Sequence, residues 1–283
     1  MVMEKTILVL LGHGSRRGSA TDLGLREVAR RLAIRFAQGP PVSLAFFEFL
    51  QPDLPTAVRD LAAAGYTRIV VLPYFLFDGK EITVEIPEAL DELRAELPHV
   101  VITQAQNLGV DPRLIEAVAE RVQGALQGTA QFQSVLPVRG AGGPLGVVLV
   151  NRGSRKRYDP GTRLEALAQA LRERLGPQAL VAPAQAENSV VTVEAAGRAL
   201  IAQGALRLVV APYLHFPGKV LADNVIPDVR RLRGDYPAVR VHLASTLCAD
   251  DRLVEICFDR ARAALAGPAQ PDPQHATAAV ALP

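Results

Sequence analysis

The chain has 283 residues, of which 49% are hydrophobic and 21% charged, enough to fill two ordinary hydrophobic cores. Its 31 Lys and Arg residues nearly balance 29 Asp and Glu residues, so the formal net charge is +2. That charge lacks the basic excess of most nucleic-acid-binding domains, and we expect no nucleic-acid partner. The two cysteines, Cys248 and Cys257, suggest neither a disulfide framework nor a zinc cluster, which favours a reducing cytoplasm.

An apolar run near the start of the chain, residues 6–11, is too short for the hydrophobic region of a signal peptide. Nowhere do eighteen or more apolar residues follow one another without a charge, so no membrane-spanning helix is predicted. We therefore expect a soluble cytoplasmic protein without a membrane partner.

Short apolar runs alternate with segments of helical period along the first half of the chain. Strands are predicted at residues 6–11, 42–48, 68–73 and 100–103, and helices at residues 19–36, 55–64, 84–97 and 111–126. Continuous apolar strands separated by helices are typical of a parallel sheet that is covered on both faces. The sequence therefore predicts an α/β fold.

The second half repeats this order of elements. Residues 127–144 are rich in Gly, Gln and Pro and are predicted to be a linker, and a second series runs from a strand at residues 145–151 to a helix that ends near residue 266. A shift of 139 residues places Gly14 on Gly153, Glu48 on Glu187 and Gly65 on Gly204. We interpret residues 1–126 and 145–266 as duplicated domains, and residues 267–283 as a disordered tail.

His13 follows the first predicted strand directly and has a glycine on either side, in Gly12-His13-Gly14-Ser15. Ligands of open α/β sheets bind at the carboxyl ends of the strands, so His13 is a candidate metal ligand or base. Glycines let the backbone turn sharply beside a flat ligand, and Ser15 could cap the next helix. The alternative is a structural turn in which the imidazole satisfies only local backbone groups.

Two carboxylates follow later strands. Glu48 ends an apolar run, where burial without a partner would be costly, so a metal, a pyrrole N–H or an arginine should compensate it. The alternative for Glu48 is an ordinary salt bridge. Glu81 comes shortly after the strand at residues 68–73, and its alternative role is that of a solvated residue in a first helical turn. We expect His13, Glu48 and Glu81 to converge as ligands suited to divalent iron or cobalt.

These residues lie in stretches that resemble the sirohydrochlorin chelatases, which include siroheme ferrochelatases and the cobaltochelatases of anaerobic cobalamin synthesis. The matching stretches are ILVLLGHGSRRGSA, FFEFLQPDLPTAV, PYFLFDGKEITVEIPEAL and NLGVDPRLIEAV, which span the first half in order. The resemblance implies two tandem chelatase-like domains, each a parallel four-stranded sheet with helices on both faces. It also implies insertion of Co²⁺ or Fe²⁺ into sirohydrochlorin, with the metal as substrate and no permanently bound cofactor.

By the same resemblance, His13 matches the metal-binding histidine of the family and Glu48 the acidic residue of its second strand. Where the family usually has a second histidine, this chain has Lys80-Glu81. A His and Glu pair is similar to the arrangement in haem-forming ferrochelatases. His13 and Glu81 are therefore the predicted metal ligands, and His13, Glu48 and Glu81 the predicted catalytic residues.

The second half keeps Glu187 but has Arg152 and Val220 at the positions of His13 and Glu81, so we expect its site to bind no metal. The substrate implied by the resemblance is a polyanion, and basic or polar side chains should bind its carboxylates. The predicted substrate-binding residues are Ser15, Arg16, Arg17, Lys80, Arg152 and Arg155. Alternatively, part of this set is only solvated surface charge.

Two other functions stay open at this point. A protein with Glu81 in place of histidine could carry a tetrapyrrole or a metal without catalysing insertion. A two-lobed periplasmic binder of small molecules is the other, although the expected lack of a signal peptide argues against it. The sequence leaves the oligomeric state, monomer or homodimer, undecided.

Overall fold

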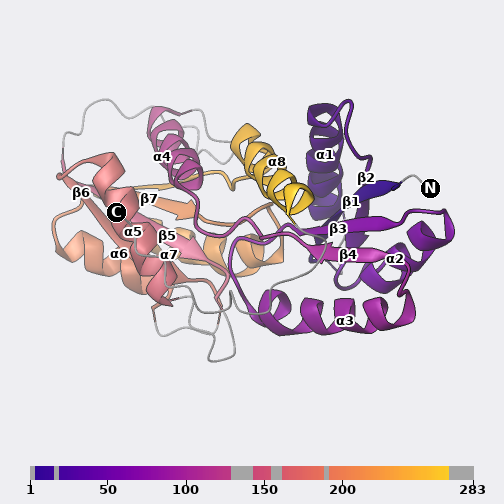
Figure 1. Cartoon of the computed structure of the whole chain (residues 1–283). Coiled ribbons are helices and arrows are strands. Elements are labelled where there is room, and N and C mark those ends of the chain that lie inside the picture. The colour runs from indigo at the N-terminus through magenta and orange to yellow at the C-terminus, as the bar shows by residue number, and fades with distance from the viewer. Residues whose placement is uncertain (1–3, 16–18, 129–142, 154–160, 188–190, 268–283) are drawn as a thin grey trace. The chain divides into compact units, whose positions relative to one another are not determined.

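The computed structural model describes residues 4–15, 19–128, 143–153, 161–187 and 191–267 (Figure 1). In the first repeat the elements are β1 (Thr6–Gly12), α1 (Ser19–Arg35), β2 (Val42–Phe46), α2 (Leu54–Ala63), β3 (Arg68–Pro73), the π-helix η1 (Glu81–Glu85), α3 (Ile86–Glu96), β4 (Val101–Gln104) and α4 (Pro112–Gln127). In the second repeat they are β5 (Leu145–Asn151), α5 (Gly161–Leu175), β6 (Ala179–Gln185), α6 (Val193–Ala202), β7 (Arg207–Pro212), the π-helix η2 (Leu221–Val225), α7 (Ile226–Asp235), β8 (Arg240–Leu243) and α8 (Asp251–Ala266).

The strands form two separate parallel sheets of four strands, in the orders β2-β1-β3-β4 and β6-β5-β7-β8. In the first sheet Leu10 of β1 is paired with Leu44 of β2 on one side and with Leu72 of β3 on the other. The strands β1 and β5 are buried along almost their whole length, because helices cover both faces of each sheet. The expected α/β fold with parallel four-stranded sheets is confirmed.

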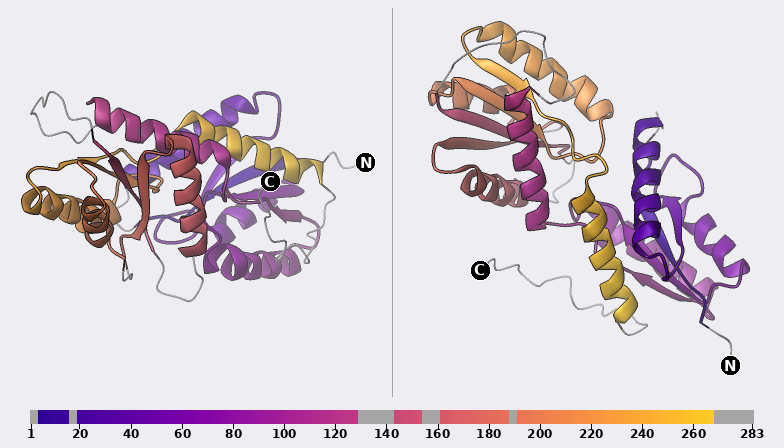
Figure 2. Two further views of the ribbon diagram at one scale, coloured as in Figure 1. Left: turned by 90° about the vertical axis from the view of Figure 1, so that its left-hand side faces the viewer. Right: turned by 90° about the horizontal axis from the view of Figure 1, so that it is seen from above.

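Helices on both sides of the first sheet complete its core. Val58 of α2 and Leu90 of α3 are buried in one cluster with Val9 and Val71 of the strands. On the other side, α8 lies alongside α1, in views at right angles to each other (Figures 1 and 2). The start of α2 is fixed by Asp53, whose side chain accepts a hydrogen bond of 2.9 Å from the backbone N–H of Thr56.

The compact units differ from the sequence repeats in one helix each. Unit 1 lies within Met1–Gly109 and Leu253–Pro283, and unit 2 is Val110–Arg252. The expected domains at residues 1–126 and 145–266 therefore describe the sequence repeat but not the packing. Most of the expected linker at residues 127–144 and of the expected tail at residues 267–283 lies outside the described residues.

Specific contacts hold the exchanged helices. In unit 2, Glu116 of α4 accepts a hydrogen bond of 2.7 Å from Arg174 of α5. In unit 1, Arg35 of α1 forms an ion pair of 3.0 Å with Glu255 of α8, and the guanidinium of Arg68 donates a 2.9 Å hydrogen bond to the Leu265 carbonyl near the end of α8. An amphipathic pattern shows that a helix has a buried face but not which sheet that face covers. This is why sequence periodicity gave no sign of the exchange.

Within the described segments, none of the helices combines the length and the apolar character that a membrane crossing would require.

Candidate active site in unit 1

His13 lies at the carboxyl end of β1, where the loop after β2 closely approaches the backbone. The N–H of Glu48 donates a hydrogen bond of 2.8 Å to the carbonyl of His13, and the N–H of Phe47 donates one of 2.8 Å to Gly12. Gly14 has φ +86°, and a Cβ atom there would lie 1.8 Å from the carbonyl oxygen of Glu48. Glycine at position 14 is thus required by both its backbone angle and the space beside it.

The carboxylate of Glu81 lies beside the imidazole of His13, with 3.9 Å between Oε1 of Glu81 and Nε2 of His13. The two side chains are 30% and 36% exposed, so solvent and a ligand can reach both. Metal bonds of about 2.1 Å to each atom would place them roughly 3.4 Å apart in a tetrahedral site. A small side-chain movement would therefore let both coordinate one ion.

A π-helix places Glu81 beside His13. Helix η1 begins at Glu81 directly after the turn that follows β3, and the hydroxyl of Thr83 donates a hydrogen bond of 3.1 Å to the carbonyl of Gly79. Such π-helical turns are uncommon and are found frequently at functional sites. The helix predicted at residues 84–97 thus begins three residues earlier than expected, and its first turn presents the carboxylate.

Lys80 is engaged within the protein. Its ammonium donates a hydrogen bond to the carboxylate of Glu85, and this bond is the main cause that raises the pKa of Lys80. The two residues are five positions apart, the spacing that η1 brings together. A role for Lys80 in binding substrate carboxylates would require it to exchange this partner.

The expected convergence of three ligands is wrong for Glu48. Strand β2 ends at Phe46, two residues earlier than predicted, and the side chain of Glu48 is exposed rather than buried. Among the described residues, no group of three or more His, Cys, Asp or Glu side chains is placed to hold a metal ion. The structure brings His13 and Glu81 together, while Glu48 contributes its backbone to the same loop.

Three phenylalanines surround the imidazole, a feature that the sequence analysis missed. The ring centroids of Phe47, Phe49 and Phe75 lie 6.2, 6.4 and 6.0 Å from that of His13. They stand in the stretches FFEFL and PYFLF, which carry the family resemblance but had been assigned no role of their own. The candidate site is therefore a histidine and carboxylate pair bordered by aromatic rings.

Unit 2 keeps the backbone of this site and lacks its ligands. Gly153 has φ +88°, a Cβ there would lie 2.2 Å from the carbonyl oxygen of Glu187, and the N–H of Glu187 donates a 2.8 Å hydrogen bond to the carbonyl of Arg152. The guanidinium of Arg152 forms an ion pair of 3.3 Å with Glu187, and Val220 precedes η2. Neither a guanidinium nor a valine can ligate a metal.

The remaining predicted substrate-binding residues are placed only in part. Ser15 is partly buried in the loop after Gly14. Arg16, Arg17 and Arg155 lie outside the described residues.

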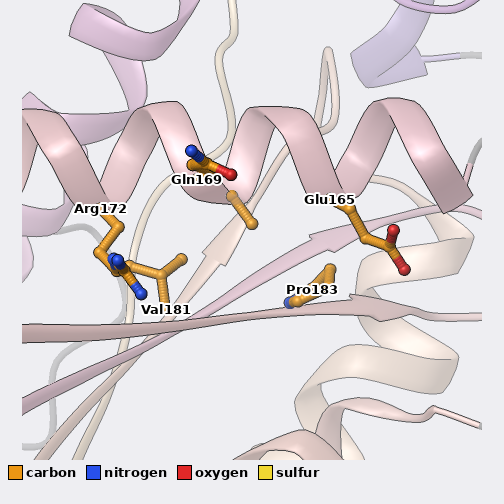
Figure 3. Close-up of a pocket in the computed structure, with 6 residues that line it drawn as sticks. Glu165, Gln169, Arg172, Val181 and Pro183 are labelled. Atoms are coloured by element: carbon orange, nitrogen blue, oxygen red, sulfur yellow. The ribbon is translucent and has the colours of Figure 1, made fainter.

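Unit 2 also contains a cavity of about 220 Å³ between α5 and the edge strand β6. Polar side chains of α5 project over the strand, as Figure 3 shows. The lining contains no His or Cys, and its carboxylate and guanidinium do not form a metal site. The lining residues are Glu165, Ala168, Gln169, Arg172, Val181 and Pro183.

A solved structure shares this architecture, and curated relatives are similar in sequence. The chain is similar to SirB from Bacillus subtilis with Fe³⁺, with a TM-score of 0.73 and 21% identity over 93% of this chain and 96% of that one. It is 24% identical over 263 residues to the sirohydrochlorin cobaltochelatase of Priestia megaterium, covering 92% of this chain and 80% of that protein. It is also 31% identical over 136 residues to the sirohydrochlorin cobaltochelatase of Methanothermobacter thermautotrophicus, covering 42% of this chain and 92% of the relative.

The family assignment rests on both repeats. The model of the family described as CbiX matches residues 7–125 and again residues 146–264. Each matched segment begins in the first strand of a repeat and ends in its last helix, α4 or α8. The chain therefore belongs to the CbiX family, with two copies of the family's domain in tandem.

Proposed function

We propose that this protein is a metal chelatase that inserts a divalent ion, Co²⁺ or Fe²⁺, into sirohydrochlorin, in siroheme or cobalamin biosynthesis. The observation that carries the proposal is the His13 and Glu81 pair at the carboxyl end of β1, 3.9 Å apart and open to solvent. Relatives named sirohydrochlorin cobaltochelatase and sirohydrochlorin ferrochelatase support the choice of substrate. The metal is a substrate here, and no permanently bound cofactor is proposed.

The residues of unit 1 divide the chemical work. Insertion exchanges two pyrrole protons for one divalent ion, so the site must both deliver the ion and remove protons. A neutral imidazole can ligate a metal or accept a proton near pH 7, and a carboxylate can do either as well. His13 and Glu81 hold the incoming ion. The two displaced pyrrole protons pass one after the other to Glu48 in the adjoining loop, or to His13 once the ion has left it, and from there to solvent.

The polyanionic substrate requires cationic and hydrogen-bonding partners. We assign its carboxylates to Ser15, Arg16, Arg17, Lys80, Arg152 and Arg155, of which Lys80 and Arg152 have protein carboxylates as partners in this structure. Unit 2 holds no metal in this proposal and serves as scaffold and source of substrate contacts. The free thiols of Cys248 and Cys257 are consistent with a cytoplasmic location. The proposal is compatible with either a monomer or a homodimer.

A second candidate function is a carrier that binds a tetrapyrrole or a metal without insertion. The observation in its favour is Glu81, which stands where the chelatases resembled here usually have a second histidine. Anaerobic incubation with excess sirohydrochlorin and Co²⁺ or Fe²⁺ separates the two functions. A chelatase changes the visible spectrum over many turnovers, whereas a carrier produces at most one equivalent of product or a stoichiometric shift.

His13→Ala tests the assignment of the site. Loss of its ligand and base should lower the insertion rate at least about 100-fold, while far-UV circular dichroism stays unchanged. His99→Ala is the matched control, because it removes another histidine of unit 1, exposed in the loop between α3 and β4, and should keep the wild-type rate. Full activity of His13→Ala, or an equal loss in both variants, would defeat the assignment.

Glu81→His should stay active in the same insertion assay and change the preference between Co²⁺ and Fe²⁺.

A further inference from the structure

Phe49 has an unfavourable backbone conformation and does not belong to the core cluster of unit 1. Its φ is +66°, in the left-handed region that bulky side chains rarely adopt, and the residue is 49% exposed. Phe47 and Phe75, by contrast, pack partly buried against the core of unit 1. A strained backbone that displays an apolar ring to solvent points to a functional reason.

The ring of Phe49 lies beside the proposed metal ligand. Its plane is 22° from parallel to the imidazole of His13, with 6.4 Å between centroids, whereas the ring of Phe47 stands at 77°. When an imidazole binds a metal at the centre of a macrocycle, its plane stands roughly perpendicular to the macrocycle. A ring nearly parallel to the imidazole would then meet the flat face with its edge, a favourable edge-to-face contact.

The second repeat offers an internal comparison. At the shift of 139 residues, the positions of Phe47, Phe49 and Phe75 hold Ala186, Asn188 and Leu214, and the position of His13 holds Arg152. The backbone approach itself is retained, since Gly14 and Gly153 both have positive φ and lie against the carbonyls of Glu48 and Glu187. The aromatic residues are therefore present where the histidine is present and are not required by the fold.

We propose that Phe49 is a substrate-binding residue, whose exposed ring contacts the tetrapyrrole face edge-on beside His13 and helps to hold the macrocycle over the metal-delivering pair. This inference rests on the proposed function and adds a residue to its binding site. The contact requires an aromatic edge and not merely a side chain of the right volume. The strained backbone is kept because it directs the ring away from the core.

Phe49→Gly separates binding from stability. Glycine accepts φ +66° without strain, so the variant should melt at the same temperature as the wild type or higher. Loss of the ring should weaken binding of metal-free sirohydrochlorin roughly tenfold and raise KM for insertion, with a smaller effect on kcat. A merely structural residue would show a fall in melting temperature together with any loss of binding. Phe49→Asn, another residue that tolerates the left-handed region, should behave in the same way.

Ile34→Ala is the matched control, because it removes another exposed apolar side chain of unit 1, near the end of α1. Its affinity for sirohydrochlorin should equal that of the wild type. Unchanged affinity in Phe49→Gly and Phe49→Asn, or an equal loss in Ile34→Ala, would overturn the inference. Metal-free titration keeps the two proposals apart: a wild-type chain that binds the tetrapyrrole but never turns it over contradicts the chelatase proposal, and a Phe49 effect on that binding still supports this one.

Discussion

Gly14→Ala tests the close approach of two loops on which the site depends. The new Cβ would lie 1.8 Å from the carbonyl oxygen of Glu48, far inside the 3.0 Å that real Cβ contacts essentially never breach. The oxygen belongs to the backbone, so no side-chain rotation relieves the overlap. One loop must move by an ångström or more, which strains the 2.8 Å hydrogen bond between the Glu48 N–H and the His13 carbonyl.

The expected cost has two parts. An alanine at φ +86° loses about 1 to 2 kcal/mol to its backbone angle, and forced overpacking adds about 1 to 3 kcal/mol, for a total of about 2 to 5 kcal/mol. Gly65→Ala is the matched control, because Gly65 has φ +84° and nothing within 4 Å of its Cβ position. It should cost only the backbone part, about 1 to 2 kcal/mol. The effect of alanine on the unfolded chain is common to both variants and cancels in the comparison.

Urea unfolding followed by far-UV circular dichroism measures the loss of stability in Gly14→Ala and Gly65→Ala. The anaerobic insertion assay shows whether Gly14→Ala also lowers the rate, as displacement of His13 should. Gly153→Ala introduces the corresponding overlap in unit 2, where the Cβ would lie 2.2 Å from the Glu187 carbonyl oxygen. It should destabilise the protein as well but lower the insertion rate less than Gly14→Ala does, because it moves a substrate contact, Arg152, and neither metal ligand. If Gly14→Ala proves no more costly than Gly65→Ala, the close approach is not a determinant of the fold, and the reasoning is refuted.

Two further predictions concern a helix cap and a thiol. Asp53→Ala should cost about 1 kcal/mol at pH 7, because Asp53 caps α2. The hydrogen bond from the Thr56 amide lowers the pKa of Asp53, so the cap's contribution to stability is complete above the unfolded pKa of about 3.9 and is lost as the pH falls through the lower folded pKa. Urea unfolding of the wild type and of Asp53→Ala should therefore show a difference in stability at pH 7 that vanishes in acid. A difference that stays constant with pH would contradict the cap. Burial in α8 raises the pKa of Cys257 to about 12. Iodoacetamide at pH 8 should therefore label the partly exposed Cys248 and leave Cys257 unlabelled until urea is added. Mass spectrometry that finds both thiols labelled in the native protein would contradict the burial of Cys257.

The strands and most helices could be predicted from periodicity, because each is an apolar or amphipathic run bounded by turn residues. The strands at residues 68–73 and 145–151 have the predicted bounds. Helix η1 was missed because a π-helical turn has no periodic signature in one sequence, although Lys80 and Glu85, five residues apart, mark it in retrospect.

The site could be predicted only as far as strand ends determine it. His13 comes directly after β1, so its place followed from the strand alone. The side chain of Glu48 depends on the loop between β2 and α2, whose path no local pattern fixes, and the expected burial was wrong. The rings near His13 come from two separate loops, so only their three-dimensional proximity showed that they form one group.

The exchanged helices also determine the order in which the protein can be completed during synthesis. Unit 2 is one continuous segment, Val110–Arg252, which interrupts unit 1 in the chain. Synthesis therefore completes unit 2 before it produces residues 253–266, the part of α8 that belongs to unit 1. Unit 1, which carries His13, begins to be synthesised before unit 2, but its core can be completed only after unit 2 has been made.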